Sequence, residues 1–238
     1  MDDDLNDFIA LRGPQPGRPL LGLTVLVVED SRFACEAMRL LCLRSGARIR
    51  RADCLRSARR HLQTYRPTIV IVDLGLPDGS GTDLIEELAR TVPRVPVILA
   101  TSGDAGLAPR AMAAGADGFL AKPIESLARF QTTVLAALPR GGTLPARVDE
   151  NGDRIVPDQI ALRDDLTHVA ALLVGGPDDG GPDDAALAYI AQFLSGIAAS
   201  AHDQPLVDAA RDLGRDHGLA LTRVSGMVRD RLAAGAAF

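Results

Sequence analysis

Lysine is almost absent from this chain of 238 residues, in which Lys122 is the only lysine among 26 basic side chains. Arginine supplies all the others. Lysine carries a compact charge on a flexible stem, whereas the guanidinium group of arginine is a planar fork. A single lysine therefore suggests a position at which arginine would not serve.

Long apolar runs are missing as well. No apolar run approaches the ~20 residues that cross a bilayer. The chain begins with Asp2, Asp3 and Asp4 and lacks the basic start and apolar core of a signal peptide. Its three cysteines, an odd number, do not show the paired spacing of a metal site. We therefore expect a cytoplasmic protein with reduced, partly buried thiols at Cys35, Cys42 and Cys54.

Acidic residues are concentrated in the second part of the chain. Residues 1–149 carry 19 basic against 17 acidic side chains, whereas residues 150–238 carry 7 against 14. Glycine and proline punctuate the start of the chain and the region that separates the two parts. The predicted organisation is an N-terminal arm at 1–22, an α/β domain at 23–140, a linker at 141–157 and a helical domain at 158–238.

One stretch organises the α/β domain. Residues 69–73 read Ile-Val-Ile-Val-Asp, and four β-branched residues in succession predict a strand that is buried on both faces. Other strands are predicted at 24–28, 47–52, 95–100 and 118–121, with helices at 31–45, 55–65, 81–90, 107–114 and 124–138. Strands that alternate with helices predict a doubly wound parallel sheet with right-handed crossovers.

Polar side chains follow four of these strands. They are Glu29 and Asp30 after the first, Asp73 after the third, Thr101 after the fourth and Lys122 after the fifth. Ligands of open α/β sheets bind beyond the carboxyl ends of the strands, so these side chains should share one edge. No glycine-rich phosphate loop follows the first strand, so a nucleotide site lacks its main element.

Three crowded carboxylates would repel one another unless a cation lay among them. Carboxylate oxygens favour Mg²⁺, which often links carboxylates to a phosphate. One carboxylate could then attack a phosphoryl group, while Lys122 and the hydroxyl of Thr101 hold its oxygens. A metal-dependent phosphatase or phosphotransferase built on the same acids is the alternative, which the absence of an evident substrate pocket or general base disfavours.

Four motifs carry a resemblance to a known family. They read Val-Leu-Val-Val-Glu29-Asp30-Ser31, Ile-Val-Asp73-Leu-Gly-Leu-Pro77, Ala-Thr101-Ser102-Gly103 and Phe119-Leu-Ala-Lys122-Pro123. With them, residues from about 23 to 138 resemble the receiver domain of bacterial two-component response regulators. The resemblance implies a five-stranded flavodoxin-like sheet with strand order 2-1-3-4-5.

The resemblance also implies roles for particular residues. Asp73 matches the phosphoacceptor, and Glu29 and Asp30 match the acidic pair that binds Mg²⁺ together with Asp73 and the carbonyl of Gly75. The donor would be a sensor histidine kinase or a phosphotransfer protein. Such a protein catalyses only its own phosphorylation and dephosphorylation, so we do not expect an enzyme.

The remaining matches concern the switch and the phosphate. Thr101 matches the switch hydroxyl, Phe119 the switch aromatic and Lys122 the lysine that contacts the phosphate. Positions Gly75 and Gly103, which flank the phosphate in this family, lack side chains here.

The part beyond residue 157 has a helical pattern. Leu162, Leu166, Val169 and Leu173 recur at four-three-four spacing, and further apolar stripes follow up to residue 232. A small helical bundle would bury these stripes, and about 80 residues often need a partner for stability. Regular stripes on an acidic domain favour a module for protein contacts or self-association.

Two other interpretations of this domain stay open. Residues 205–232 could form a degenerate helix-turn-helix with Arg223, Arg229 and Arg231 facing DNA, although the acidic excess disfavours DNA as a partner.

The other is a phosphotransfer bundle around His168. Such bundles usually have a lysine and a glycine in the next turn, where Ala171 and Leu172 stand here.

Overall fold

The computed structural model describes residues 17–139, 154–174, 181–215 and 217–234, so most of the predicted arm and linker lie outside the described residues. Its main element is a five-stranded sheet in the order β2-β1-β3-β6-β7, with every neighbouring pair parallel. This confirms the predicted order 2-1-3-4-5. The strands are β1 Thr24–Val28, β2 Arg48–Ala52, β3 Ile69–Asp73, β6 Val97–Ser102 and β7 Gly118–Ala121.

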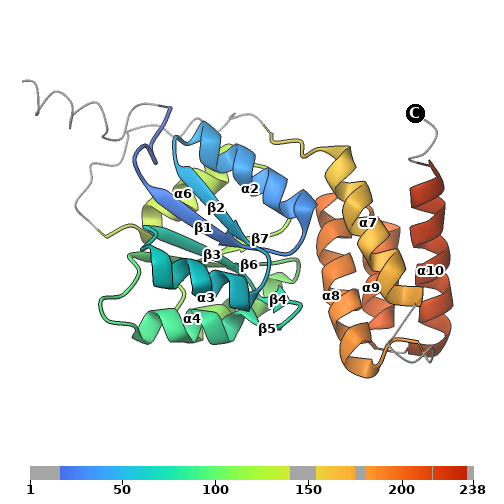
Figure 1. Cartoon of the computed structure of the whole chain (residues 1–238). Helices are drawn as coiled ribbons and strands as arrows, with labels where there is room; N and C mark the ends of the chain where they lie inside the picture. Colours follow the sequence, from blue (N-terminus) through green and yellow to red (C-terminus); the bar gives the residue numbers. More distant parts are fainter. Residues whose placement is uncertain (1–16, 140–153, 175–180, 216, 235–238) are drawn as a thin grey trace, which may run out of the picture.

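Helices cover both faces of the sheet (Figure 1). Successive side chains of a strand point to opposite faces. Ile69 and Ile71 therefore join the core beneath α2 and α6, whereas Val70 and Val72 join the core beneath α3, α4 and α5. These helices are α2 Arg32–Arg44, α3 Leu55–Thr64, α4 Gly81–Arg90, α5 Ala108–Ala113 and α6 Leu127–Ala137, with a 3-10 turn η1 at Ala105–Leu107.

The loop after β3 is folded tightly beneath the sheet edge. A β-carbon on Gly81 would lie 1.9 Å from the carbonyl oxygen of Asp73, so only glycine allows this approach. The loop contains a short antiparallel hairpin, β4 Gly75–Leu76 and β5 Gly79–Ser80, which the sequence did not predict. Two-residue strands carry no periodicity from which they could be recognised.

The α/β domain extends beyond its predicted limits at both ends. Leu20, assigned to the arm, is fully buried in the core beneath α2 and α6. Ile155, assigned to the linker, is buried in the same core, and its N–H donates to the carbonyl of Glu125. Single apolar residues among polar neighbours gave no pattern, so the sequence did not reveal these anchors.

In the described residues, the second domain comprises four helices with a separate apolar core. It lies at the carboxyl ends of the strands, where α7 and α8 pack against α2 and α8 also packs against β4 (Figure 1). No helix in the described ranges is long and apolar enough to span a membrane. The four helices are α7 Gln159–Val174, α8 Asp184–Ser200, α9 Gln204–Leu213 and α10 His217–Ala234.

Candidate phosphoacceptor site

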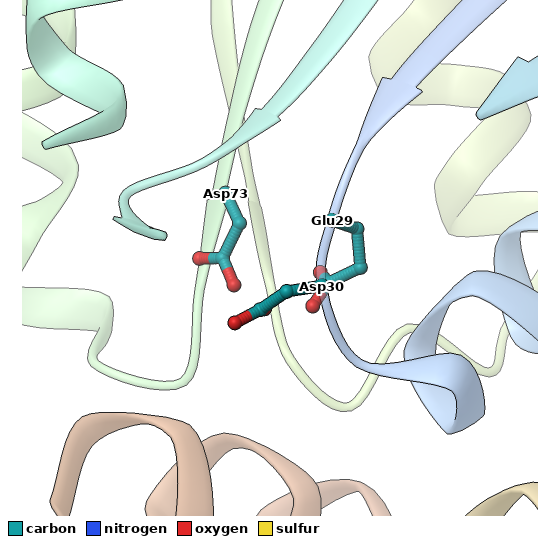
Figure 2. Close-up of side chains that lie close together, drawn as sticks. All are labelled: Glu29, Asp30 and Asp73. Atoms are coloured by element: carbon teal, nitrogen blue, oxygen red, sulfur yellow. The ribbon is translucent and has the colours of Figure 1, made fainter. Parts of the chain in front are cut away.

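Three carboxylates converge at the carboxyl edge of the sheet. Glu29 and Asp30 follow β1, and Asp73 ends the adjacent strand β3. Figure 2 shows the three side chains pointing toward a common space, and one oxygen of each lies within 4.8 Å of the others. The predicted cluster is therefore present in the structure.

The only lysine joins this cluster from the fifth strand of the sheet. Nζ of Lys122 lies 2.7 Å from Oδ2 of Asp73 and 2.6 Å from Oε2 of Glu29. Burial opposes the charged ammonium, but the charges of Asp73 and Glu29 raise the pKa of Lys122 above its usual value. The side chain is thus a buried cation directly beside the acceptor carboxylate.

The acidic cluster fits a divalent cation. Burial and the charge of Asp73 raise the pKa of Glu29 well above its usual value, and burial raises that of Asp30 to about 6. Oδ1 of Asp30 is buried and has no hydrogen-bond partner among the described residues. Three carboxylates that share a single ammonium group offer the hard oxygen donors that Mg²⁺ prefers. These residues could hold such an ion.

The hydroxyl of Thr101 is hydrogen-bonded to the backbone of β7 and not to the acidic cluster. It pairs with Asp73 in the sheet register, but its hydroxyl donates to the carbonyl of Leu120 at 2.8 Å. The next two residues, Ser102 and Gly103, line the cavity beside Asp73. Phe119 is partly buried against the core beneath α3, α4 and α5. The switch roles of Thr101 and Phe119 stay predictions.

Gly75 lines the same cavity as Asp73. Its N–H donates to Oδ1 of Asp73 at 3.3 Å. The backbone that follows the acceptor is therefore held against it, and the part of the Gly75 carbonyl in metal binding stays a prediction.

Helix α8 is a component of the site that the sequence did not reveal. The hydroxyl of Tyr189 donates to Oδ2 of Asp30 at 2.7 Å, and four α8 residues complete the wall of the cavity. The remaining space is about 10 Å³, room for about one water molecule. The four residues are Gln192, Phe193, Gly196 and Ile197.

His168 lies beside this wall but does not line the cavity. It is exposed on α7, and its ring packs edge-on against Phe193, with 5.8 Å between the ring centres. A role in phosphotransfer stays untested.

Comparison with protein families assigns the first domain. The model described as "Response regulator receiver domain" matches residues 25–134. Residues 25–134 are a response regulator receiver domain.

Three curated relatives that match this receiver domain are each named as a transcriptional regulatory protein. The Escherichia coli KDP operon transcriptional regulatory protein KdpE is 35% identical over 49% of this chain and 51% of its own length. The probable transcriptional regulatory protein TcrX of Mycobacterium tuberculosis is 31% identical over 64% and 63%, respectively. The virulence transcriptional regulatory protein PhoP of Salmonella typhimurium is 33% identical over 46% and 50%.

The chain spans less than two thirds of the length of each of these relatives. Among solved structures, a putative response regulator from Chloroflexus aurantiacus is 26% identical to it. That likeness has a TM-score of 0.45 and covers 48% of this chain and 96% of the other.

Proposed function

We propose that this protein is a response regulator of a two-component phosphorelay, which accepts a phosphoryl group on Asp73 from a histidine kinase or phosphotransfer protein. The observation that carries the proposal is the buried ammonium of Lys122 between Asp73 and Glu29. A cation in this position is suited to bind the oxygens of a phosphoryl group on Asp73.

The transfer follows from the contacts of Asp73. One carboxylate oxygen attacks phosphorus, a new O–P bond forms, and the P–N bond to the donor imidazole breaks with its electron pair returning to nitrogen. Lys122 exchanges its bond to Oδ2 for a bond to a phosphoryl oxygen. Mg²⁺ held by Glu29, Asp30 and Asp73 would supply further positive charge beside those oxygens.

Water returns the protein to its initial state. Hydrolysis of the acyl phosphate releases inorganic phosphate and regenerates the carboxylate of Asp73. On this proposal the protein catalyses only its own phosphorylation and dephosphorylation.

Labelling of Asp73 tests this function. Incubation with Mg²⁺ and acetyl phosphate should give an acid-stable, base-labile phosphoprotein, whereas Asp73→Asn should not label. Asp83→Asn, at an exposed position of α4, is the matched control and should label like the wild type. Equal labelling of Asp73→Asn would contradict the assignment.

We infer that the helical domain signals through protein contacts. Two of the three arginines proposed to face DNA are already paired, Arg231 with Asp203 and Arg223 with Asp212. These pairs reduce the positive charge that a DNA backbone could use.

Phosphorylation-controlled DNA binding is the second candidate. The relatives are named transcriptional regulatory proteins, which favours it and does not support excluding DNA as a partner.

A further inference from the structure

Three glycines allow α8 to lie directly on the acceptor site. A β-carbon on Gly75 would lie 2.2 Å from Nε2 of Gln192, and one on Gly103 would lie 3.2 Å from the Cα of Gly196. The first distance would require the side chain of Gln192 to move, and the second would require the backbone of α8 at Gly196 to shift by a few tenths of an ångström. The two positions that flank the phosphate therefore lack side chains where α8 occupies the space.

Polar contacts hold the helical domain at the same place. Asp165 of α7 accepts hydrogen bonds from Oγ of Ser31 at 2.7 Å, the N–H of Arg32 at 2.9 Å and the N–H of Phe33 at 3.0 Å. These groups are at the start of α2, directly after the acidic pair. Together with the bond between Tyr189 and Asp30, they fix α7 and α8 over the phosphoacceptor.

In the part of the chain that the structure describes, the two domains do not share an apolar core. Among the described residues, no apolar cluster contains side chains of both domains, because the receiver cores and the helical core have no member in common. Contacts between domains that are made by polar groups and small residues permit relative motion. Each domain therefore keeps its own core when α8 moves away.

A phosphoryl group and the docked helix cannot occupy this space together. The cavity beside Asp73 holds about 10 Å³, whereas a phosphoryl group adds a phosphorus atom and three oxygens. The donor must also reach the carboxylate from the side that α8 covers. A phosphoryl group on Asp73 would in addition attract Lys122 away from its present contact with Glu29.

We propose that the face formed by α7 and α8 covers the phosphoacceptor site of this chain's own receiver domain, and that this docking and phosphorylation of Asp73 exclude each other. The proposal rests on the proposed function, because it needs Asp73 to be the acceptor. Docking slows phosphorylation, and phosphorylation in turn releases the α7–α8 face to bind a partner.

A pair of helix glycines gives a matched test on the full-length chain. Gly196→Leu places a side chain in the cavity between α8 and the acceptor site, where its β-carbon would lie 3.9 Å from Nζ of Lys122. Gly226→Leu makes the same change in α10, where a β-carbon would meet nothing within 4 Å. With Mg²⁺ and acetyl phosphate, Gly196→Leu should label at least about tenfold faster than the wild type, because the competent open state is more populated. Gly226→Leu should label at the wild-type rate.

Amide hydrogen exchange tests the release of α8 on the wild-type protein. Amide hydrogen exchange in α8 should become faster when Mg²⁺ and beryllofluoride, a phosphoryl mimic, are added, while exchange in β3 stays slow. Wild-type labelling as fast as that of Gly196→Leu, with α8 exchange unchanged by the mimic, would contradict the proposal that α8 blocks phosphorylation of Asp73. The proposed function would then stay intact. Absence of labelling in all three proteins would overturn the proposed function itself.

Discussion

Asp30 is the one carboxylate of the acidic cluster that does not form an ion pair with Lys122. Burial raises its pKa from an ordinary value of 3.8 to about 6; the hydrogen bond from Tyr189 opposes this shift and the charge of Asp73 adds to it. Ionised Asp30 therefore costs folding free energy at neutral pH when no cation is bound. Sites assembled for a ligand commonly carry such a cost.

Asp30→Asn should stabilise the metal-free protein. In chelator at pH 7 the free energy of unfolding should rise by roughly 2 kcal/mol. This is the energy that corresponds to the raised pKa of Asp30, reduced for relaxation of the surrounding structure. The amide oxygen of the new side chain can still accept the bond from Tyr189. Chemical denaturation measures the change, and Asp53→Asn, at an exposed position, should stay within ±0.5 kcal/mol.

The gain in free energy of unfolding caused by Asp30→Asn should depend on pH. Because the pKa of Asp30 is raised on folding, folded Asp30 binds its proton more tightly than the unfolded chain does, so the ionisation cost is full above about pH 6. It decreases as the pH falls from about 6 toward 3.8. The advantage of Asp30→Asn should therefore shrink over this interval, and an advantage that grows instead would contradict the assignment.

At the scale of elements, helix α2 has a cap that comes from another domain. Oγ of Ser31 accepts from the N–H of Ala34, which is an ordinary N-cap. Asp165 of α7 accepts from two further N–H groups of the first turn and from the Ser31 hydroxyl. A carboxylate at a helix N-terminus is favoured by the helix dipole, so α2 and α7 stabilise each other.

Asp165→Ala should weaken this junction much more than Asp164→Ala. The first change leaves buried donors of α2 without an acceptor and should lower the free energy of unfolding by about 1–3 kcal/mol. The second breaks only an exposed ion pair with Arg32 and should cost no more than about 0.5 kcal/mol. Urea denaturation of both variants measures the difference, and equal losses would show that the cap adds nothing.

Strands β1 and β3 were predictable because buried parallel strands are continuous apolar runs rich in β-branched residues. β1, β3 and β7 begin and end at the predicted residues, whereas β6 begins two residues later and continues through Thr101 to Ser102. The cluster of Glu29, Asp73 and Lys122 followed from the rule that parallel strands end at one edge.

The covering helix was not predictable from periodicity. The sequence places Tyr189 and Gln192 outside the apolar stripe of α8, as for surface residues of any amphipathic helix. Their contacts depend on how two domains dock, which local pattern does not encode. The available signal was the absence of side chains at Gly75 and Gly103, together with a glycine inside α8 at Gly196.

At the scale of the whole molecule, the receiver domain and the acidic helical domain have unequal charge. Residues 150–238 carry 7 basic against 14 acidic side chains, and the only lysine is committed to the acceptor site. A duplex would meet like charge over most of the helical domain. Release of α7 and α8 from the receiver would expose a further acidic group at Asp165.

The proposed output through protein contacts predicts weak binding to DNA in both phosphorylation states, whereas the second candidate predicts tight binding. A DNA-binding module neutralises several phosphates, so its affinity falls steeply as salt rises. We expect no duplex binding by the full-length chain in ~50 mM salt, with or without Mg²⁺ and beryllofluoride, in fluorescence anisotropy with a library of mixed-sequence duplexes. Light scattering on the same samples should instead show the mimic-dependent formation of a protein complex, either a dimer or an assembly with an added partner. Tight binding to a duplex that weakens steeply with salt, and that is lost in Arg223→Ala and Arg229→Ala, would make the helix-turn-helix the output of this receiver.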